Sequence, residues 1–116
     1  MKTVVGISGA SGIIYGTRLL EALPGKKTVI VSRDALKLAK VELGLDLRDI
    51  HALADCHFDN DDMEATIASG SVKFDAMVIA PCSTSTMSKI ACGIADNLMT
   101  RVASVALRRG GSLCWS

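Results

Sequence analysis

The sequence predicts an α/β fold in which a doubly wound parallel sheet lies between two layers of helices, giving a three-layer α/β/α domain. Short apolar, β-branched runs typical of buried strands alternate with segments of helical periodicity, and turns that contain Gly or Ser separate them. Because strand–helix–strand connections are almost always right-handed, helices should cover both faces of the sheet. The 116 residues, of which 49% are hydrophobic, suffice for one compact core, so we expect residues 1–116 to form a single domain.

The first expected unit is a strand, a glycine turn and a helix. Residues Lys2 to Ser8 are mostly apolar and β-branched, which predicts a central strand buried on both faces. Gly9-Ala10-Ser11-Gly12 then ends the strand. Apolar residues recur at helical spacing from Ile13 until Pro24-Gly25 ends the helix.

The second expected unit repeats this order. Thr28 to Val31 has the strand pattern, and Ser32 suits the N-cap of a helix that runs to about Leu43, where Gly44 stops it. The stretch from Asp46 to Asp62 is polar and irregular, and it is the least predictable region of the chain.

The remaining expected elements are a short helix, a strand and two helices, namely Met63 to Ala68, Ala76 to Ala80, Met87 until Gly93, and a helix capped by Asp96 that ends near Arg108. Pro81 closes the strand. Cys82-Ser83-Thr84-Ser85-Thr86 should form a small polar loop that leads into the next helix.

Composition excludes several classes of function. Thirteen basic and twelve acidic residues leave a net charge of +1, so no broad electrostatic field would recruit nucleic acid or an anionic membrane. The apolar runs are far shorter than a membrane span, and the first residues do not resemble a signal peptide, which predicts a cytoplasmic protein. The four cysteines form no C-x-x-C pair, so we expect no zinc site and interpret them as buried thiols in a reducing compartment.

Ligands of doubly wound sheets bind beyond the carboxyl ends of the strands, which here are residues 9–12, Ser32 and residues 81–86. The first loop has the spacing G-x-x-G-x-x-G rather than G-x-G-x-x-G, and Ser32 stands where an acidic ribose ligand is expected, so NAD is disfavoured. Exposed amides and a hydroxyl at a helix N-terminus suit a single phosphate or the edge of a polar heterocycle. The alternative is a Gly-rich turn that only packs closely.

The run from Ser83 to Thr86 offers four hydroxyls at the start of a helix, which could hold phosphate or ribityl oxygens; the alternative is an N-cap with spare polar residues. Glu42 shares the helical stripe of Ala35 and Ala39, so it is either a carboxylate near a pocket or a helix-end acid that reaches solvent. Hydrolase motifs are missing, and His51 and His57 are interpreted as solvated loop residues.

Four segments in this order and spacing resemble the UbiX/Pad-type flavin prenyltransferase family, over residues 1 to about 109: Gly6-Ile7-Ser8-Gly9-Ala10-Ser11-Gly12-Ile13-Ile14-Tyr15-Gly16, Val31-Ser32, Ala80-Pro81-Cys82-Ser83, and Gly93-Ile94-Ala95-Asp96-Asn97-Leu98-Met99-Thr100-Arg101. The resemblance implies a flavodoxin-like Rossmann fold and FMN as cofactor. It also implies transfer of a dimethylallyl group from dimethylallyl phosphate to the flavin, without a metal. The product, prenylated FMN, serves UbiD-type decarboxylases, including those of ubiquinone biosynthesis.

The resemblance also assigns roles to single residues. It implies FMN contacts at the following positions: Gly9, Ala10, Ser11, Ser32, Ser83, Thr84, Ser85 and Thr86. It implies that Ser11 lies beside the flavin N5 and the prenyl phosphate, and that Glu42 is an acid/base group near that phosphate. Both roles make chemical sense, because cleavage of an allylic C–O bond requires stabilisation of the leaving phosphate. Members of the family form large symmetric oligomers with the flavin at subunit contacts, so a homo-oligomer is expected.

The sequence departs from the family after the last expected helix. Family members continue with a core strand, an FMN-binding Arg in an Arg-Glu-Thr-Pro motif, and later residues that hold the prenyl phosphate. Residues 110–116 do not resemble that strand, so we expect a C-terminally truncated member, either natural or the product of a shifted reading frame. The alternatives are therefore an FMN-binding or assembly module without turnover, and a flavin-dependent cysteine decarboxylase, whose catalytic His and Asn-rich motif have no match here.

Overall fold

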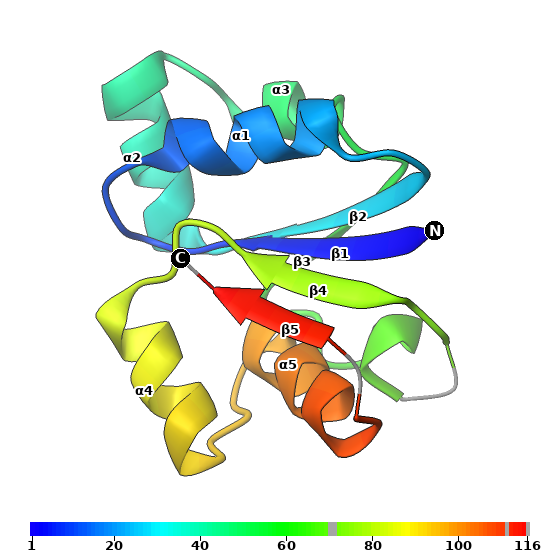
Figure 1. Ribbon diagram of the computed structural model, residues 1–116. Coiled ribbons are helices and arrows are strands. Elements are labelled where there is room, and N and C mark those ends of the chain that lie inside the picture. Colours follow the sequence, from blue (N-terminus) through cyan, green and yellow to red (C-terminus); the bar gives the residue numbers. More distant parts are fainter. Residues whose placement is uncertain (70–71, 111, 116) are drawn as a thin grey trace.

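In the computed structural model, which describes residues 1–69, 72–110 and 112–115, a parallel sheet lies between two layers of helices (Figure 1). The elements in chain order are β1 (Lys2–Ile7), α1 (Ile13–Ala22), β2 (Lys26–Val31), α2 (Arg33–Leu43), α3 (Leu47–His51), β3 (Cys56–Asp59), η1 (Thr66–Ser69), β4 (Ala76–Ile79), α4 (Thr84–Cys92), α5 (Leu98–Arg108) and β5 (Ser112–Trp115). Within the described residues the strand order is β3-β2-β1-β4-β5, and each neighbouring pair is parallel. The predicted doubly wound three-layer fold is confirmed.

Two apolar clusters, one on each face of the sheet, join the layers. Successive residues of a strand point to opposite faces, so Val5 and Ile7 pack with the cluster of α1 and α2, whereas Val4 packs with the cluster of α5. Figure 1 shows α1, α2 and α3 on one side of the sheet and α4 and α5 on the other. The strand β1 is therefore covered on both faces, which explains its nearly continuous apolar sequence.

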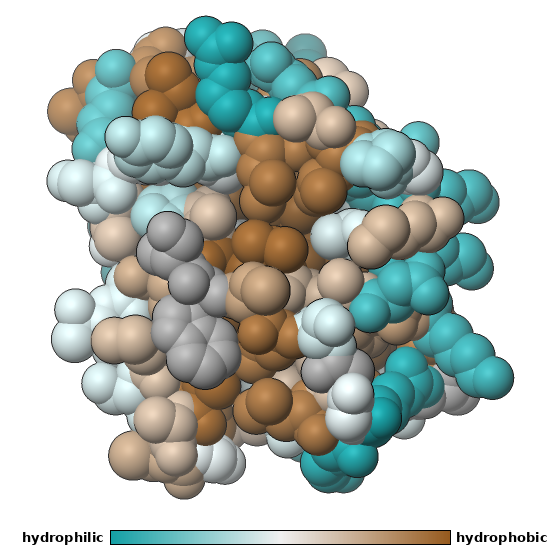
Figure 2. Space-filling model, viewed as in Figure 1, coloured by the Kyte–Doolittle hydropathy of each residue, from teal (hydrophilic) through white to brown (hydrophobic). Residues whose placement is uncertain are grey.

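The residues that the structure describes cover the β5 side of the sheet on one face only. Leu113 of β5 packs against the α5 cluster, but on the opposite face Val78 is half-buried and Cys114 is exposed. Figure 2 shows hydrophobic side chains gathered in a band across this side of the molecule, over β4 and β5. Although the sequence of this tail does not resemble the strand of the family, Ser112–Trp115 forms a strand that pairs in parallel with β4.

The region from Asp46 to Asp62 is more regular than its sequence indicates. It holds the short helix α3, whose first turn is fixed by a bond from the Asp46 main-chain N–H to Asp49 Oδ2 at 2.8 Å, and the edge strand β3, which pairs with β2. The short helix expected from Met63 to Ala68 is a single 3₁₀ turn, Thr66–Ser69.

Two helix starts also differ from expectation. Helix α4 begins at Thr84 rather than near Met87, because the Ser83 hydroxyl accepts a hydrogen bond from the Thr86 N–H at 3.2 Å and caps it. Helix α5 is capped by Asn97, not Asp96; Asn97 Oδ1 accepts from the Thr100 N–H at 2.9 Å. The polar run after Pro81 is therefore mostly the first turn of a helix.

Most of the cysteines lie at the surface. Cys56, Cys92 and Cys114 are exposed and Cys82 is half-buried, so the interpretation of the cysteines as buried residues is wrong. Burial raises the pKa of the Cys82 thiol. In the part of the chain that the structure describes, every helix is too short or too polar to cross a membrane.

Candidate functional site

The three predicted loops lie together at the carboxyl ends of β1, β2 and β4. Hydrogen bonds join the strand ends, because the Ser32 N–H donates to the Ile7 carbonyl at 3.0 Å and the Ala80 N–H donates to the Gly6 carbonyl at 2.9 Å. The connections after β1 lead away from β4, so the strand order reverses between β1 and β4. Such a reversal point is where doubly wound sheets bind ligands.

Ser8 connects the first and third loops, and sequence reasoning missed it. Its side chain is 1% exposed. The Ser8 hydroxyl donates to the Pro81 carbonyl at 2.8 Å and accepts from the Ser83 N–H at 2.7 Å, and its main-chain N–H donates to Pro81 at 3.1 Å. A hydroxyl at the end of a buried apolar strand is a signal that could have identified it, since such a group needs buried partners.

The first loop is shaped by glycines. A Cβ on Gly9 would lie 2.5 Å from the Asp34 Cβ, so only glycine allows this loop to approach the first turn of α2. Gly12 has φ 94° and precedes α1 without a side-chain cap. The first amides of α1 are therefore left to other acceptors, which is the arrangement that binds an anionic group at a helix N-terminus.

The predicted hydroxyls fall into two groups. Ser32 Oγ accepts from the Ala35 N–H at 3.1 Å, and Ser83 Oγ caps α4 and lies 2.9 Å from Thr86 Oγ1, so these hydroxyls serve as helix caps or their partners. The remaining hydroxyls are exposed at the starts of α1 and α4, and they belong to Ser11, Thr84 and Ser85. Gly9 and Ala10, which complete the predicted set, are half-buried in the first loop.

Glu42 lies apart from these loops. It is exposed in the last turn of α2, as expected for the second alternative, a helix-end acid that reaches solvent. Ser32 caps the other end of this helix, and ten residues of helix correspond to ~15 Å along its axis. A single copy of the chain therefore does not bring Glu42 to the hydroxyls at the strand ends.

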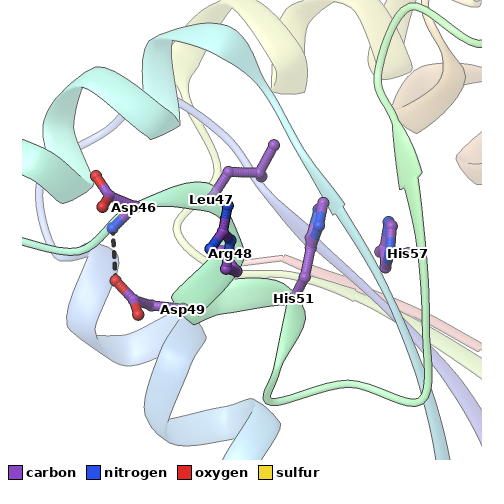
Figure 3. Close-up of a pocket in the computed structure, with 6 residues that line it drawn as sticks. All are labelled: Asp46, Leu47, Arg48, Asp49, His51 and His57. Atoms are coloured by element: carbon purple, nitrogen blue, oxygen red, sulfur yellow. Dashed lines mark hydrogen bonds between the residues drawn. The ribbon is translucent and has the colours of Figure 1, made fainter.

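A different recess of about 760 Å³ lies between α3 and β3 (Figure 3), and it contains none of the predicted site residues. The rings of His51 and His57 stack there, with centroids 3.7 Å apart. Burial and the neighbouring His57 lower the pKa of His51 below its ordinary value of 6.5, while Asp59 acts in the opposite direction. The interpretation of both histidines as loop residues is wrong, because His51 belongs to α3 and His57 to β3.

Among the described residues, no group of three or more His, Cys, Asp or Glu side chains is arranged to hold a metal ion. The features that point to a ligand are therefore those of the strand-end loops: a glycine turn, an uncapped helix start and exposed hydroxyls on two neighbouring helices. Together they suit a molecule that carries a phosphate and several hydroxyl groups.

Comparison with known proteins places this geometry in context. Residues 1–114 match the sequence model of the family described as Flavoprotein. The flavin prenyltransferase UbiX of Thermoplasma acidophilum is 50% identical over 109 residues, which cover 93% of this chain and 61% of that protein. The chain thus spans about 61% of the length of this relative.

Two solved structures have the same fold. A dodecameric FMN-dependent UbiX-like decarboxylase from Escherichia coli O157:H7 superposes with a TM-score of 0.95 at 38% identity, over 99% of this chain and 65% of that one. A UbiX protein (PadA1) in complex with FMN and dimethylallyl pyrophosphate superposes with a TM-score of 0.94 at 33% identity, over 97% of this chain and 61% of that one.

Proposed function

The chain belongs to the flavoprotein family, and from this premise we propose that it binds FMN at the carboxyl ends of β1, β2 and β4. The observation that carries the proposal is the network of Ser8, which fixes two loops against each other beside the uncapped start of α1. Backbone amides at helix starts bind phosphate, and the hydroxyls of Ser11, Thr84 and Ser85 suit the ribityl chain. Gly9 and Ala10 would allow the flavin to approach the backbone, while Ser32, Ser83 and Thr86 would hold the helix starts in place.

The reaction we propose is transfer of a dimethylallyl group from dimethylallyl phosphate to FMN. The flavin supplies the nucleophile when bound. This chain's part is to orient both molecules and to stabilise the phosphate that leaves when the allylic C–O bond breaks. Ser11 is the hydroxyl at the start of α1 that we assign to the phosphate, and Glu42 is the acid/base group. The product, prenylated FMN, would be handed to a UbiD-type decarboxylase.

The position of Glu42 adds a condition to this proposal. Because Glu42 lies ~15 Å from Ser32 along α2, it would act on the loops of a second copy and not on those of its own chain. A homo-oligomer with the flavin at a contact between copies meets this condition, and we propose such an assembly. The dodecameric relative from Escherichia coli is compatible with it.

A second candidate function is an FMN-binding or assembly module without turnover. It is favoured by one observation: Glu42, the proposed acid/base group, is in the last turn of α2 and lies ~15 Å along this helix from Ser32, so a single copy has the loops without Glu42 beside them. Two measurements separate the candidates. FMN fluorescence during titration reports binding, and mass spectrometry after anaerobic incubation with reduced FMN and dimethylallyl phosphate reports prenylated flavin.

Prenyl transfer requires both signals, and a module without turnover gives the first alone. A protein that leaves FMN fluorescence unchanged would contradict both prenyl transfer and FMN binding, and it would leave only the assembly role. The Thr3→Val variant is the matched control, since Thr3 is buried on β1 and makes none of the proposed contacts to FMN.

A further inference from the structure

A second recess lies at the amino ends of β1 and β2, whereas the flavin loops follow the carboxyl ends of these strands. Its volume is about 210 Å³, and the first residues of β1 and β2, Lys2 and Lys26, line it. The whole of β1, six residues long, separates it from Ser8, which corresponds to ~20 Å of extended strand. The recess is therefore no part of the site proposed for FMN.

The floor of this recess is apolar and partly aromatic. Val4 and Ile67 are 1% and 4% exposed, and Phe58 and Phe74 are half-buried beside them. An engineered protein cavity of ~150 Å³ holds one benzene molecule. A space of about 210 Å³ therefore admits a single ring with one small substituent, and it is too small for a nucleotide.

The rim of the recess is positively charged. Lys2, Lys26 and Lys73 line it and are exposed, and none of them forms an ion pair within the described part of the chain. Lys2 and Lys26 are register partners on neighbouring strands, so two like charges lie side by side on one face. An anion between them would offset this repulsion.

The other charged groups of the rim do not neutralise these lysines. The Lys27 ammonium group already has a partner, because it donates a hydrogen bond to the Leu20 carbonyl. Asp55 is the acid that lines the recess, and its Oδ2 accepts the main-chain N–H of Lys27 at 2.8 Å. The rim therefore keeps an excess of positive charge.

We propose that this recess binds a small aromatic carboxylate, with its ring against Phe58 and Phe74 and its carboxylate among Lys2, Lys26 and Lys73. The apolar floor requires a hydrophobic body, the volume limits that body to one ring, and the lysines select a negative charge over a neutral group. This site does not require FMN, so a test of carboxylate binding is independent of the function proposed above.

Cysteine alkylation tests this proposal within one protein. Cys56 lines the recess and is exposed, whereas Cys92 is exposed at the end of α4 and serves as an internal reference. The full chain is treated with iodoacetamide, with and without benzoate, and the alkylation rate of each cysteine is followed by peptide mass spectrometry. With ~10 mM benzoate we expect the rate at Cys56 to fall at least ~3-fold, as a site of millimolar affinity requires, and the rate at Cys92 to stay unchanged.

Two controls make the result specific to a carboxylate at this place. Benzyl alcohol has the ring without the charge, and acetate has the charge without the ring; neither should protect Cys56. Lys26→Ala should weaken protection by benzoate ~5-fold or more, since a charge-assisted contact is lost, whereas Lys37→Ala on the exposed side of α2 should not. Any one of four results would overturn the proposal. Two concern benzoate, which would leave Cys56 unprotected or would slow both cysteines equally. In the others, benzyl alcohol would protect Cys56 as well as benzoate does, or the two lysine variants would have equal effects.

Discussion

Replacement of Ser8 by Ala tests the network on which the proposed flavin site depends. The substitution removes one buried hydroxyl and with it two hydrogen bonds, to the Pro81 carbonyl and from the Ser83 N–H. Pro81 keeps the bond from the Ser8 main-chain N–H, so it remains satisfied. The half-buried Ser83 N–H loses the acceptor that the Ser8 hydroxyl provides, and a donor left without a partner costs ~1–3 kcal/mol where water does not replace that partner.

We therefore expect Ser8→Ala to lower the free energy of unfolding by ~2 kcal/mol, which corresponds to a fall in Tm of ~8 °C for a domain of this size. Thr3→Val is the matched control. Thr3 also lies on β1, is 2% exposed, and its hydroxyl is buried without a hydrogen-bond partner in the described structure. Its removal should leave stability unchanged or raise it by ~1 kcal/mol.

Urea unfolding followed by circular dichroism measures both variants, and equal m-values would show that the unfolded states are comparable. FMN titration supplies a second readout, in which Ser8→Ala should weaken binding and Thr3→Val should not. A loss of stability below ~0.5 kcal/mol for Ser8→Ala, or equal losses for the two variants, would refute the idea that this hydroxyl holds the loops together.

Three further predictions follow from other parts of the structure. Gly9→Ala places a Cβ 2.5 Å from that of Asp34, so it should cost ~1–3 kcal/mol in urea unfolding and weaken FMN binding; wild-type values for both would contradict the close approach of loop and helix. The pKa of His51 is lowered by burial and by His57, so the unfolded chain binds more protons below pH 6.5 and stability should fall as the pH drops through that range. His51→Gln should reduce this pH dependence, and an unchanged profile would exclude the pair as its source. Burial raises the pKa of Cys82, so its alkylation at pH 8 should be slower than that of an exposed cysteine, and equal rates would contradict this environment.

The central strand could be predicted from the sequence because burial on both faces requires a nearly continuous apolar run. Strand β1 is covered on both faces, and its apolar run identifies it without further information. The edge strand β3 has no such signal. Cys56, His57 and Asp59 are exposed and only Phe58 is half-buried, so its sequence has the polarity of a loop, and only its pairing with β2 makes it a strand.

Helix boundaries and helix faces show a second limit of sequence reasoning. Asp96 and Asn97 are both good N-cap residues, and the choice depends on which side chain reaches the Thr100 N–H, a matter of backbone path. For Glu42, the period of the helix gives its direction around the axis of α2, but not whether a neighbour covers the last turn. Ala39 is fully buried one turn earlier, whereas Glu42 is exposed.

The place where the three loops lie could be predicted from the sequence. Which of their hydroxyls cap helices and which are exposed could not. Three loops at strand ends follow from the fold, yet the structure commits Ser32 and Ser83 to capping the helices that carry them. A ligand at this edge would therefore meet mainly backbone amides and a few exposed hydroxyls such as Ser11. Because amides are positioned by the loop path, substitutions at Ser8 and Gly9 should impair FMN binding more than Ser11→Ala does, although neither residue offers a free side-chain group to the ligand. A stronger effect at Ser11 than at Ser8 would mean that side-chain contacts, and not the arrangement of the loops, dominate the affinity for FMN.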